Sequence, residues 1–371
     1  MSYGCTRSGS LLVLLGPARR ICAVAALAPH DQFARLREIL DRSYAPADHP
    51  ALIAQTDQWS STRPLVGVSM LDVTPVFTNT LAKYLPLIAG GADLTVSLSP
   101  LLPHDRKVVR VLRDLGIPVT DQPGHYDVVM DCAGVQAAST AAAGYVELTK
   151  SGQHVYESCA KPVFLVDDSR IKLIETSLGT GDGLIRALAH FGHADLVDRS
   201  IVIFGCGKVG SGAAAQAMGA GAKVTVIDSD AATHPPTGAD FIEASDQDGV
   251  RAAVASAWCV VSATGSAGAL TPLVDELRES GAILANLGAE DEFGPGMPAS
   301  RVLHGKLPVN FVLPEPTHLR YLDATMALVN ACALELLSGH YGAGLHRPPQ
   351  RLEQPILKVA AMPHNHLGLG G

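Results

Sequence analysis

The sequence predicts an α/β protein of two domains, and three observations support that prediction. The chain has 371 residues, which at about 150 residues per domain is enough for two or three domains. Hydrophobic residues make up 47% of the chain and aromatic residues only 5%, with 36 glycines, a composition that suits close packing of helices on sheets. Short apolar runs alternate with helical segments of about 10–15 residues, which is typical of βαβ units and a parallel sheet.

The first unit is expected to fill the N-terminal half of the chain. Residues 31–41 carry apolar side chains at helical spacing and predict a helix. The stretch 45–64 is rich in Pro, Asp and Ser and is interpreted as loop. Strands are then predicted at 65–70, 94–98, 128–130 and 162–166, with helices at 74–88 and 104–115.

A second α/β unit follows a long predicted helix at about 176–191. Its predicted strands are 200–204, 223–227, 259–263, 282–286 and 309–313, with a helix of small residues at 210–221. Another long helix is predicted at 320–338. We therefore expect a substrate domain over 1–178, an inserted Rossmann domain over 179–317, a helix over 318–345 that returns to the first domain, and a tail over 346–371 to which no regular structure is assigned.

Charge and hydropathy exclude two classes of partner. The chain has 28 Lys and Arg against 36 Asp and Glu, a net charge of −8, and no long basic stretch, so we expect no nucleic-acid partner. No apolar run approaches the roughly 20 residues that span a membrane. The Leu11–Leu15 run is shorter than the core of a signal peptide, which needs about 7–15 residues, so we expect a cytoplasmic protein.

Cysteines and apolar composition bear on metals and assembly. The 7 cysteines are scattered and never form a C-x-x-C pair, which argues against a disulfide framework and against a zinc site. We therefore expect no metal. The surplus of apolar surface predicts a homo-oligomer, either a dimer or a tetramer.

The strongest motif is the loop GCGKVG, which begins at Gly205 after an apolar strand and opens a small-residue helix. In such a loop the first glycine permits a tight turn, the second lets backbone approach a pyrophosphate, and the third allows close helix packing. Asp228 ends the next strand, where a carboxylate binds ribose hydroxyls and repels a 2′-phosphate, so NAD is favoured over NADP. Lys208 would weaken that preference only if it pointed at the ribose. The predicted cofactor-binding residues here are Gly205, Gly207, Lys208, Val209, Gly210 and Asp228.

Two further turns follow predicted strands of the same unit. They contain Thr264 and Gly265 after one strand, and Asn286 and Gly288 after the next. Because α/β folds bind ligands at the carboxyl ends of their strands, we expect these four residues beside the nicotinamide. Ordinary strand-to-helix turns are the alternative.

The block from Val166 to Gly221 resembles the S-adenosylhomocysteine hydrolase family. The resemblance rests on Asp168-Ser169 with Lys172 beyond them, the helix that follows, the G-x-G-x-V-G-x-G loop and Asp228. It continues through Thr264-Gly265 and Asn286-Leu287-Gly288 and covers most of residues 65–340. The order of parts is also similar, with a substrate domain first, an NAD domain inserted and a late helix that returns.

The resemblance implies a chemistry and roles for several residues. The family holds NAD tightly, oxidises the 3′-hydroxyl of a nucleoside, eliminates a thiol, adds water and returns the hydride. Lys172 matches the family lysine that assists proton removal; the alternative is a surface helix lysine that forms an ion pair with Asp168 or Glu175. Asp131 falls at the position of a substrate-binding aspartate, and Glu147 and Thr149 fall near the family's Glu-Glu-Thr segment. Asp168 is a further expected substrate contact.

The sequence departs from the family at several catalytic positions. Thr176 and Ser177 stand in place of an asparagine–aspartate dyad, and Ala289 stands in place of a histidine. Ser69 lies near the position of a substrate histidine, and the family's tyrosine-bearing tail has no counterpart. Elimination and hydration need acids and bases on both sides of the ring, so hydrolysis is not the first expectation.

The remaining candidates are His318 and the acidic run 290–292. His318 lies between Glu315 and Asp323 and is expected to act as a replacement acid or base, or else to be a merely polar loop residue. The acidic run is expected either to contact the substrate or to form a solvated loop.

The prediction is an NAD-dependent enzyme that oxidises a secondary hydroxyl of a polar small molecule such as a nucleoside. Lys172 is the expected base, with Asp131, Glu147, Thr149 and His318 orienting the substrate. The alternatives are a true adenosylhomocysteine hydrolase, an amino- or hydroxy-acid dehydrogenase with exchanging NAD, and a catalytically silent NAD-binding regulatory paralogue.

Overall fold

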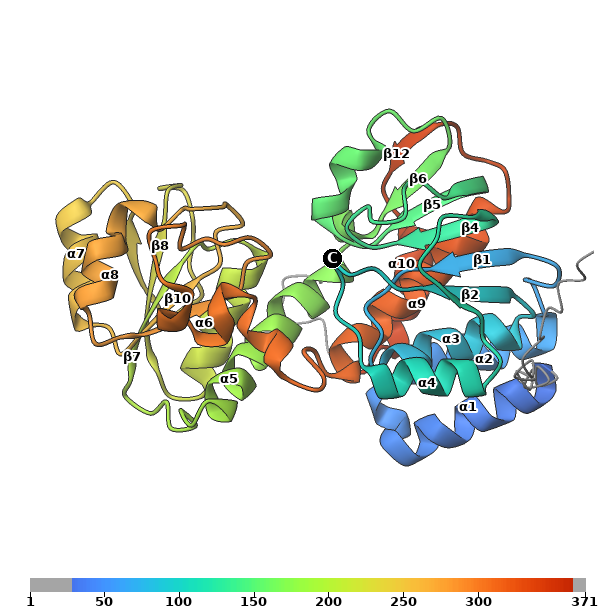
Figure 1. Cartoon of the computed structure of the whole chain (residues 1–371), viewed down its shortest axis with the longest axis horizontal. Helices are drawn as coiled ribbons and strands as arrows, with labels where there is room; N and C mark the ends of the chain where they lie inside the picture. The colour runs from blue at the N-terminus through green and yellow to red at the C-terminus, as the bar shows by residue number, and fades with distance from the viewer. Residues whose placement is uncertain (1–28, 363–371) are drawn as a thin grey trace, which may run out of the picture.

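The computed structural model describes residues 29–362, which form two α/β units joined by crossing segments (Figure 1). The Leu11–Leu15 run and the last nine residues of the predicted tail lie outside the described residues. Strands β1–β6 and β12 share one sheet and strands β7–β11 share the other, so the second unit is inserted into the first. This arrangement confirms the predicted two-domain α/β fold with an inserted Rossmann unit.

The first sheet has seven parallel strands in the order β12-β6-β5-β4-β1-β2-β3. Their bounds are Ser69–Asp72 (β1), Asp93–Ser97 (β2), Val119–Thr120 (β3), His125–Asp131 (β4), Thr140–Glu147 (β5), Pro162–Leu165 (β6) and Gly344–His346 (β12). The central strands are buried on both faces because helices cover one face and short loop segments cover the other.

The helices of the first unit come from both ends of the described chain. They are α1 (Pro29–Ser43), α2 (Pro50–Thr62), α3 (Thr80–Ala89), α4 (Arg106–Asp114), α9 (Leu319–Leu336) and α10 (Gln350–Val359), with short turns η1 (Pro46–Asp48), η2 (Lys150–Tyr156) and η3 (Val166–Asp168). The returning helix α9 is largely buried and packs against α2, α3 and the sheet, as the sequence predicted for a helix that returns to this domain.

The second sheet has five parallel strands in the order β11-β10-β7-β8-β9, the doubly wound order of a dinucleotide-binding domain. Its strands are Ser200–Phe204 (β7), Lys223–Asp228 (β8), Asp240–Glu243 (β9), Cys259–Ser262 (β10) and Ile283–Asn286 (β11). Its helices and short turns are α5 (Thr180–His190), α6 (Lys208–Gly219), α7 (Gln247–Ser256), α8 (Val274–Glu279), η5 (Thr271–Leu273), η6 (Ala299–Arg301), η7 (Leu303–Lys306) and η8 (Val309–Val312).

One continuous helical run connects the two units. It begins at Lys172, widens into a π-helical turn (η4, Ile174–Gly179) and continues as α5 into the Rossmann unit. We call residues 172–190 the crossing helix. It lies so close to α6 that a Cβ on Gly212 would be 2.1 Å from the carbonyl oxygen of Ser177. The fourth glycine of the dinucleotide loop is therefore needed for packing between the crossing helix and α6.

Several segments differ from their predictions, among them the following three. Residues 45–64 contain helix α2 rather than loop alone, because Leu52 and Trp59 are buried against the core, although the stretch is rich in Pro, Asp and Ser. Residues 309–313 form the 3-10 turn η8 and not a strand; Pro308 and Pro314 bracket them. The stretch after His346, predicted without regular structure, contains α10.

None of the helices within residues 29–362 has the length and apolarity needed to span a membrane. No group of three or more His, Cys, Asp or Glu side chains is arranged there to hold a metal ion.

Candidate functional site

The glycine loop after β7 has the geometry that a pyrophosphate requires. Gly205 has a φ of +93°, which favours glycine, and a Cβ there would lie 2.4 Å from the carbonyl oxygen of Ala263. Around Gly207, by contrast, a Cβ would meet nothing within 4 Å, so its backbone borders open space. Helix α6 begins directly after Gly207, and no side chain caps its first turn. The free N–H groups of that turn and the open backbone fit a dinucleotide phosphate.

Asp228 lies beside this loop at the end of β8. Its Oδ2 accepts a 2.6 Å hydrogen bond from the backbone N–H of Cys206, and its Oδ1 accepts from the N–H of Asp230 at 3.0 Å. The side chain is half-buried, so the carboxylate keeps accessible lone pairs. A ribose diol could donate to them, whereas a 2′-phosphate would be repelled.

Lys208 points away from Asp228. Its Nζ donates to the carbonyl oxygen and to Oδ2 of Asp167, at 2.7 and 2.9 Å, in the first domain. The backbone oxygen of Lys208 also accepts from the Ser177 hydroxyl at 2.7 Å. The neighbouring Val209 is half-buried against the Rossmann core. The glycine loop is therefore bonded to the segment on either side of Lys172.

The predicted nicotinamide-side turns are held by Glu292, which the sequence offered only as a member of the acidic run 290–292. Glu292 is fully buried, and its carboxylate accepts from the N–H and hydroxyl of Thr264, both at 2.8 Å, and from the N–H of Gly265 at 2.7 Å. The expectation of a solvated loop or of a substrate contact is therefore wrong for Glu292. Asp291 is exposed and pairs with Lys306.

Asn286 and Gly288 are also part of this framework. The buried Asn286 amide donates to the carbonyl oxygens of Gly288, Glu290 and Lys306, at 3.2, 2.7 and 2.7 Å. A Cβ on Gly288 would overlap the Glu292 carboxylate, at 1.8 Å from its Oε1. Both residues shape the strand end, and the Asn286 side chain is occupied by these bonds.

Asp131 and Glu147 stand opposite one another at the ends of β4 and β5. Asp131 is 2% exposed and accepts from Cys132 N–H, Gln136 N–H and the Tyr156 hydroxyl, the last at 2.5 Å. Burial raises the pKa of Asp131 to about 6, while the Tyr156 bond opposes the rise. The Asp131 carboxylate is thus used to order its own loop.

Glu147 has the same kind of role. It is fully buried and accepts from the backbone N–H groups of Ala133, Gly134 and Thr149, at 3.0, 3.2 and 2.9 Å. The Thr149 hydroxyl donates to it at 2.8 Å. Burial raises the pKa of Glu147, and these bonds oppose the rise. The structure therefore brings Asp131, Glu147 and Thr149 together, with their oxygens satisfied by the protein.

Lys172 lies near this carboxylate pair. It is 2% exposed, and its Nζ is 2.7 Å from Oε1 of Glu175, one turn along the crossing helix. Among the described residues, Oε2 of Glu175 is buried without a hydrogen-bond partner. Burial raises the pKa of the Cys132 thiol; Glu147 adds to that rise and Lys172 opposes it, as expected if Lys172 and Glu147 both lie close to Cys132. The ion pair with Glu175 is one that the alternative interpretation of Lys172 named, although Lys172 is buried and not at the surface.

Asp168 and His318 are placed differently from these residues. Asp168 lies at the start of the Lys172 segment, with its carboxylate 3.9 Å from the Arg347 guanidinium. The His318 ring lies 3.9 Å from Oδ2 of Asp182 and 3.7 Å from Oε2 of Glu315, where the chain returns from the Rossmann unit. The partners of His318 therefore lie in the segments that cross between the two units, and not at the Asp131–Glu147 edge.

A buried ion pair also ends strand β1. Lys83 bonds to Asp72 and to the Thr74 hydroxyl, and the Tyr84 hydroxyl donates to Asp72 at 2.9 Å. Asp72, Lys83 and Tyr84 are at most 1% exposed. The predicted strand 65–70 stopped short of Asp72, so the apolar pattern did not place this carboxylate at a strand end.

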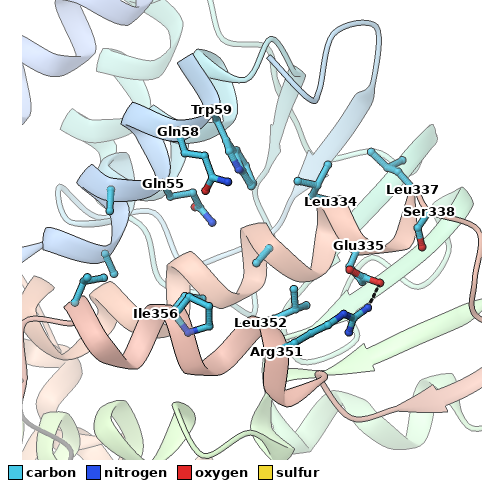
Figure 2. Close-up of a pocket in the computed structure, with 15 residues that line it drawn as sticks. Gln55, Gln58, Trp59, Leu334, Glu335, Leu337, Ser338, Arg351, Leu352 and Ile356 are labelled. Carbon is cyan, nitrogen blue, oxygen red and sulfur yellow. Dashed lines mark hydrogen bonds and ion pairs between the residues drawn. The ribbon is translucent and has the colours of Figure 1, made fainter. Parts of the chain in front are cut away.

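A separate cavity of about 680 Å³ lies between α2, α9 and α10 (Figure 2). Its lining is mostly apolar, with Trp59, Leu352 and Ile356 among the larger side chains. The Glu335–Arg351 ion pair borders it at 2.5 Å. None of the predicted site residues lines it, so it is not the cofactor site.

Comparisons with known proteins agree with this geometry. Residues 193–294 match a family described as "Putative NAD(P)-binding". The adenosylhomocysteinase of Thermosynechococcus vestitus is 26% identical over 224 residues, which are 50% of this chain and 51% of that protein. The adenosylhomocysteinase of Gloeothece citriformis is 26% identical over 306 residues, 68% of each chain. In the first of these alignments the chain spans about half the length of its relative.

Solved structures give weaker likenesses. A dipicolinate synthase from Bacillus halodurans has a TM-score of 0.45 and 11% identity, over 73% of this chain and 98% of that one. A transhydrogenase from Sinorhizobium meliloti has a TM-score of 0.45 and 17% identity, over 75% and 97%.

The chain is distantly similar to adenosylhomocysteinases, as its motifs indicated. The match over the Rossmann unit, together with the open glycine loop and Asp228, supports NAD as the cofactor.

Proposed function

We propose that this protein is an NAD-dependent enzyme that oxidises a secondary hydroxyl of a polar small molecule. The observation that carries the proposal is the joining of the glycine loop to the Lys172 segment. Ser177 and Asp167 both bond to Lys208 of that loop, and Lys172 lies between them in the sequence. This joining supports a position of the Lys172 segment beside the residues that would bind NAD.

The proposed chemistry divides between the cofactor and the chain. NAD, when bound, supplies the hydride acceptor. Lys172 in its neutral form accepts the proton of the substrate hydroxyl, which a general base in a water-poor site does effectively. Glu175 holds the Lys172 amine at 2.7 Å and can exchange that proton with it, since its second oxygen has no other partner.

Alcohol oxidation is favoured over complete hydrolysis of a thioether. Elimination and hydration would need additional free acids and bases. Asp131 and Glu147 already accept hydrogen bonds from their own loops. Ala289 and Thr176 provide no titratable group at positions where the related family has a histidine and an asparagine. We propose a nucleoside or another hydroxylated metabolite as substrate, with the hydride either returned or released as NADH.

The test begins with the purified protein. Mass spectrometry after denaturation should find NAD or NADH at close to one per chain. Adenosine, adenosylhomocysteine and a panel of polyols are then added, and nicotinamide reduction is followed at 340 nm. Reduction by at least one of these alcohols is expected, with Lys172→Arg inactive. Bound NAD that no alcohol reduces would overturn the proposal in favour of a silent NAD-binding protein, and thiol release from adenosylhomocysteine would make it a hydrolase.

We also propose that the protein assembles as a dimer or tetramer. The chain is 47% hydrophobic and leaves an apolar cavity between α2 and α10. Light scattering after size exclusion should give at least twice the mass of the chain; a monomer at micromolar concentration would contradict this.

A further inference from the structure

The turn that leads into the crossing helix contains three backbone N–H groups that side chains satisfy, since the first N–H groups of a helix have no partner within it. They belong to Arg170, Ile171 and Lys172. Ser169 accepts from the N–H of Lys172 through its hydroxyl at 3.1 Å, in the manner of an N-cap residue. The local sequence therefore satisfies one of the three groups.

The other two groups are satisfied from the far end of the chain. Oε2 of Glu353, in α10, accepts from the N–H of Arg170 at 2.9 Å and from the N–H of Ile171 at 3.3 Å. Glu353 is 6% exposed, so water does not readily replace it. A negative charge at a helix start is also electrostatically favourable. Glu353 and Ser169 together cap the turn that leads into the crossing helix at Lys172.

This cap fixes the backbone from which the Lys172 side chain leaves. Without it, the buried N–H of Ile171 would lack a partner, at a cost of about 1–3 kcal/mol, the half-buried N–H of Arg170 would lose its bond to Glu353, and the turn would open. Lys172 is the third residue of that turn, and its ion pair with Glu175 needs both residues in helical register. The position of the Lys172 amine thus depends on a side chain about 180 residues away.

We infer that Glu353 is a positioning residue for Lys172, and through it for the reaction. This inference rests on the proposed function for its catalytic meaning, but its geometric content can be tested without a substrate. It also implies that a change in how α10 packs would change the position of the Lys172 amine. Two side chains of α10 allow a specific effect of Glu353 to be told apart from a general effect of α10 packing. Glu353 contacts the turn before Lys172, whereas Arg351 pairs with Glu335 of α9 beside the cavity (Figure 2).

The experiment compares Glu353→Ala, Glu353→Gln and the control Glu335→Ala in the full chain with its bound NAD. Hydrogen exchange is measured at the amides of Arg170 and Ile171. The Lys172 side chain is followed by NMR with [6-13C]lysine, assigned through Lys172→Arg. Both hydrogen bonds end on one oxygen, so the Gln carbonyl oxygen can replace it.

In Glu353→Ala, both amides should exchange at least tenfold faster and the Lys172 resonance should move. Glu353→Gln should restore the resonance and bring exchange to within about threefold of wild type, and Glu335→Ala should change neither. If Glu353→Ala is not recovered folded, Glu353→Asp replaces it, because it withdraws the carboxylate by one methylene.

Two results would overturn the inference. One is a Lys172 resonance that stays in place while the amides exchange faster. The other is an equal response in Glu335→Ala, which would make α10 docking as a whole responsible. Absence of alcohol oxidation in the wild-type protein, with both readouts responding as expected, would instead count against the proposed function alone.

Discussion

The carboxyl ends of the two sheets differ in what their polar groups are used for. In the Rossmann unit, Gly207 borders open space and Asp228 is half-buried beside it. In the first unit, Asp131 and Glu147 are almost fully buried and each accepts several hydrogen bonds from its own loop. One edge is open to a ligand, and the carboxylates of the other edge order the protein.

This difference bears on where the proposed reaction takes place. A preformed dinucleotide edge needs only a correctly placed reactive group from the other domain. In the proposed function the first domain supplies that group on the crossing helix, as the Lys172–Glu175 pair, and not on its strand ends. Acidic residues at strand ends are thus a poor guide to reactivity until their partners are known.

The proposed role of Lys172 as the base is tested most directly by Lys172→Arg. Arginine keeps the positive charge toward Glu175 but does not give up its proton, so it cannot act as a base. We expect alcohol-dependent NAD reduction to fall about a thousandfold, within the usual range for general bases, while bound NAD is retained. Stopped-flow absorbance at 340 nm measures the rate. Lys150→Met, at an exposed position, should leave it unchanged, and a loss below tenfold would place the base elsewhere.

The openness of the Rossmann edge is tested by Gly210→Ala. The added Cβ would lie 1.9 Å from the carbonyl oxygen of Gly205, so the loop must shift. We expect NAD affinity to fall roughly a hundredfold, the equivalent of about 3 kcal/mol of overpacking. Calorimetric titration with NAD measures it. Gly219→Ala in the same helix meets nothing within 4 Å and should bind like wild type; equal losses in both would show that the helix, and not the loop, is sensitive.

The scaffold role of Asp131 is tested by Tyr156→Phe. The folded pKa of Asp131 is about 6, above its ordinary 3.8, so its favourable contribution to stability is full at low pH and is lost as pH rises through 6. Tyr156→Phe removes a bond that lowers this pKa, so the loss should extend to higher pH. We expect a cost of about 2 kcal/mol at pH 8 and less at pH 5, from urea unfolding.

Tyr145→Phe is the matched control for that measurement. The Tyr145 hydroxyl donates to the carbonyl oxygen of Ser139 at 2.9 Å and not to Asp131. Its cost should therefore be the same at both pH values. A cost for Tyr156→Phe that does not depend on pH would mean that the Tyr156 hydrogen bond does not favour the ionised form of Asp131.

The smallest effect is expected from breaking the Lys208–Asp167 ion pair, which joins the glycine loop to the first domain. Lys208 is 39% exposed and Asp167 is 14% exposed, and such ion pairs contribute at most about 1 kcal/mol. Lys208→Ala should lower NAD affinity less than fivefold, and the difference should shrink between 50 and 500 mM salt, as titrations at both concentrations would show. A larger loss that does not depend on salt would mean that Lys208 binds the cofactor itself.

The sequence was most informative where the signal is local. Continuous β-branched runs at 200–204 and 223–227 predicted strands, and the glycines between them predicted the loop, because both patterns depend on neighbouring residues. Helix α2 was missed because the stretch 45–64 is rich in Pro, Asp and Ser, and Trp59 within it is buried only by tertiary packing. Strand β5 was missed because three alanines and a glycine give little strand signal.

The site residues follow the same rule. The positions of Gly205 and Asp228 could be predicted, since a motif fixes them. Glu292 and Glu353 could not, because each acts on backbone N–H groups that are distant in sequence. The buried state of Asp131 and Glu147 depended on the fold of a loop that no short motif describes.

The π-helical turn between Ile174 and Gly179 sets the angular phase between the two domains. Each residue of an α-helix turns the chain by about 100° and advances it by about 1.5 Å. A π-helical turn closes its hydrogen bonds over five residues and not four, so it holds one residue more than an α-helical turn. A chain shortened by one residue here could continue as an α-helix with the two domains nearly in phase, whereas a deletion in the α-helical part of the crossing helix would rotate Lys172 by about 100° relative to the Rossmann unit.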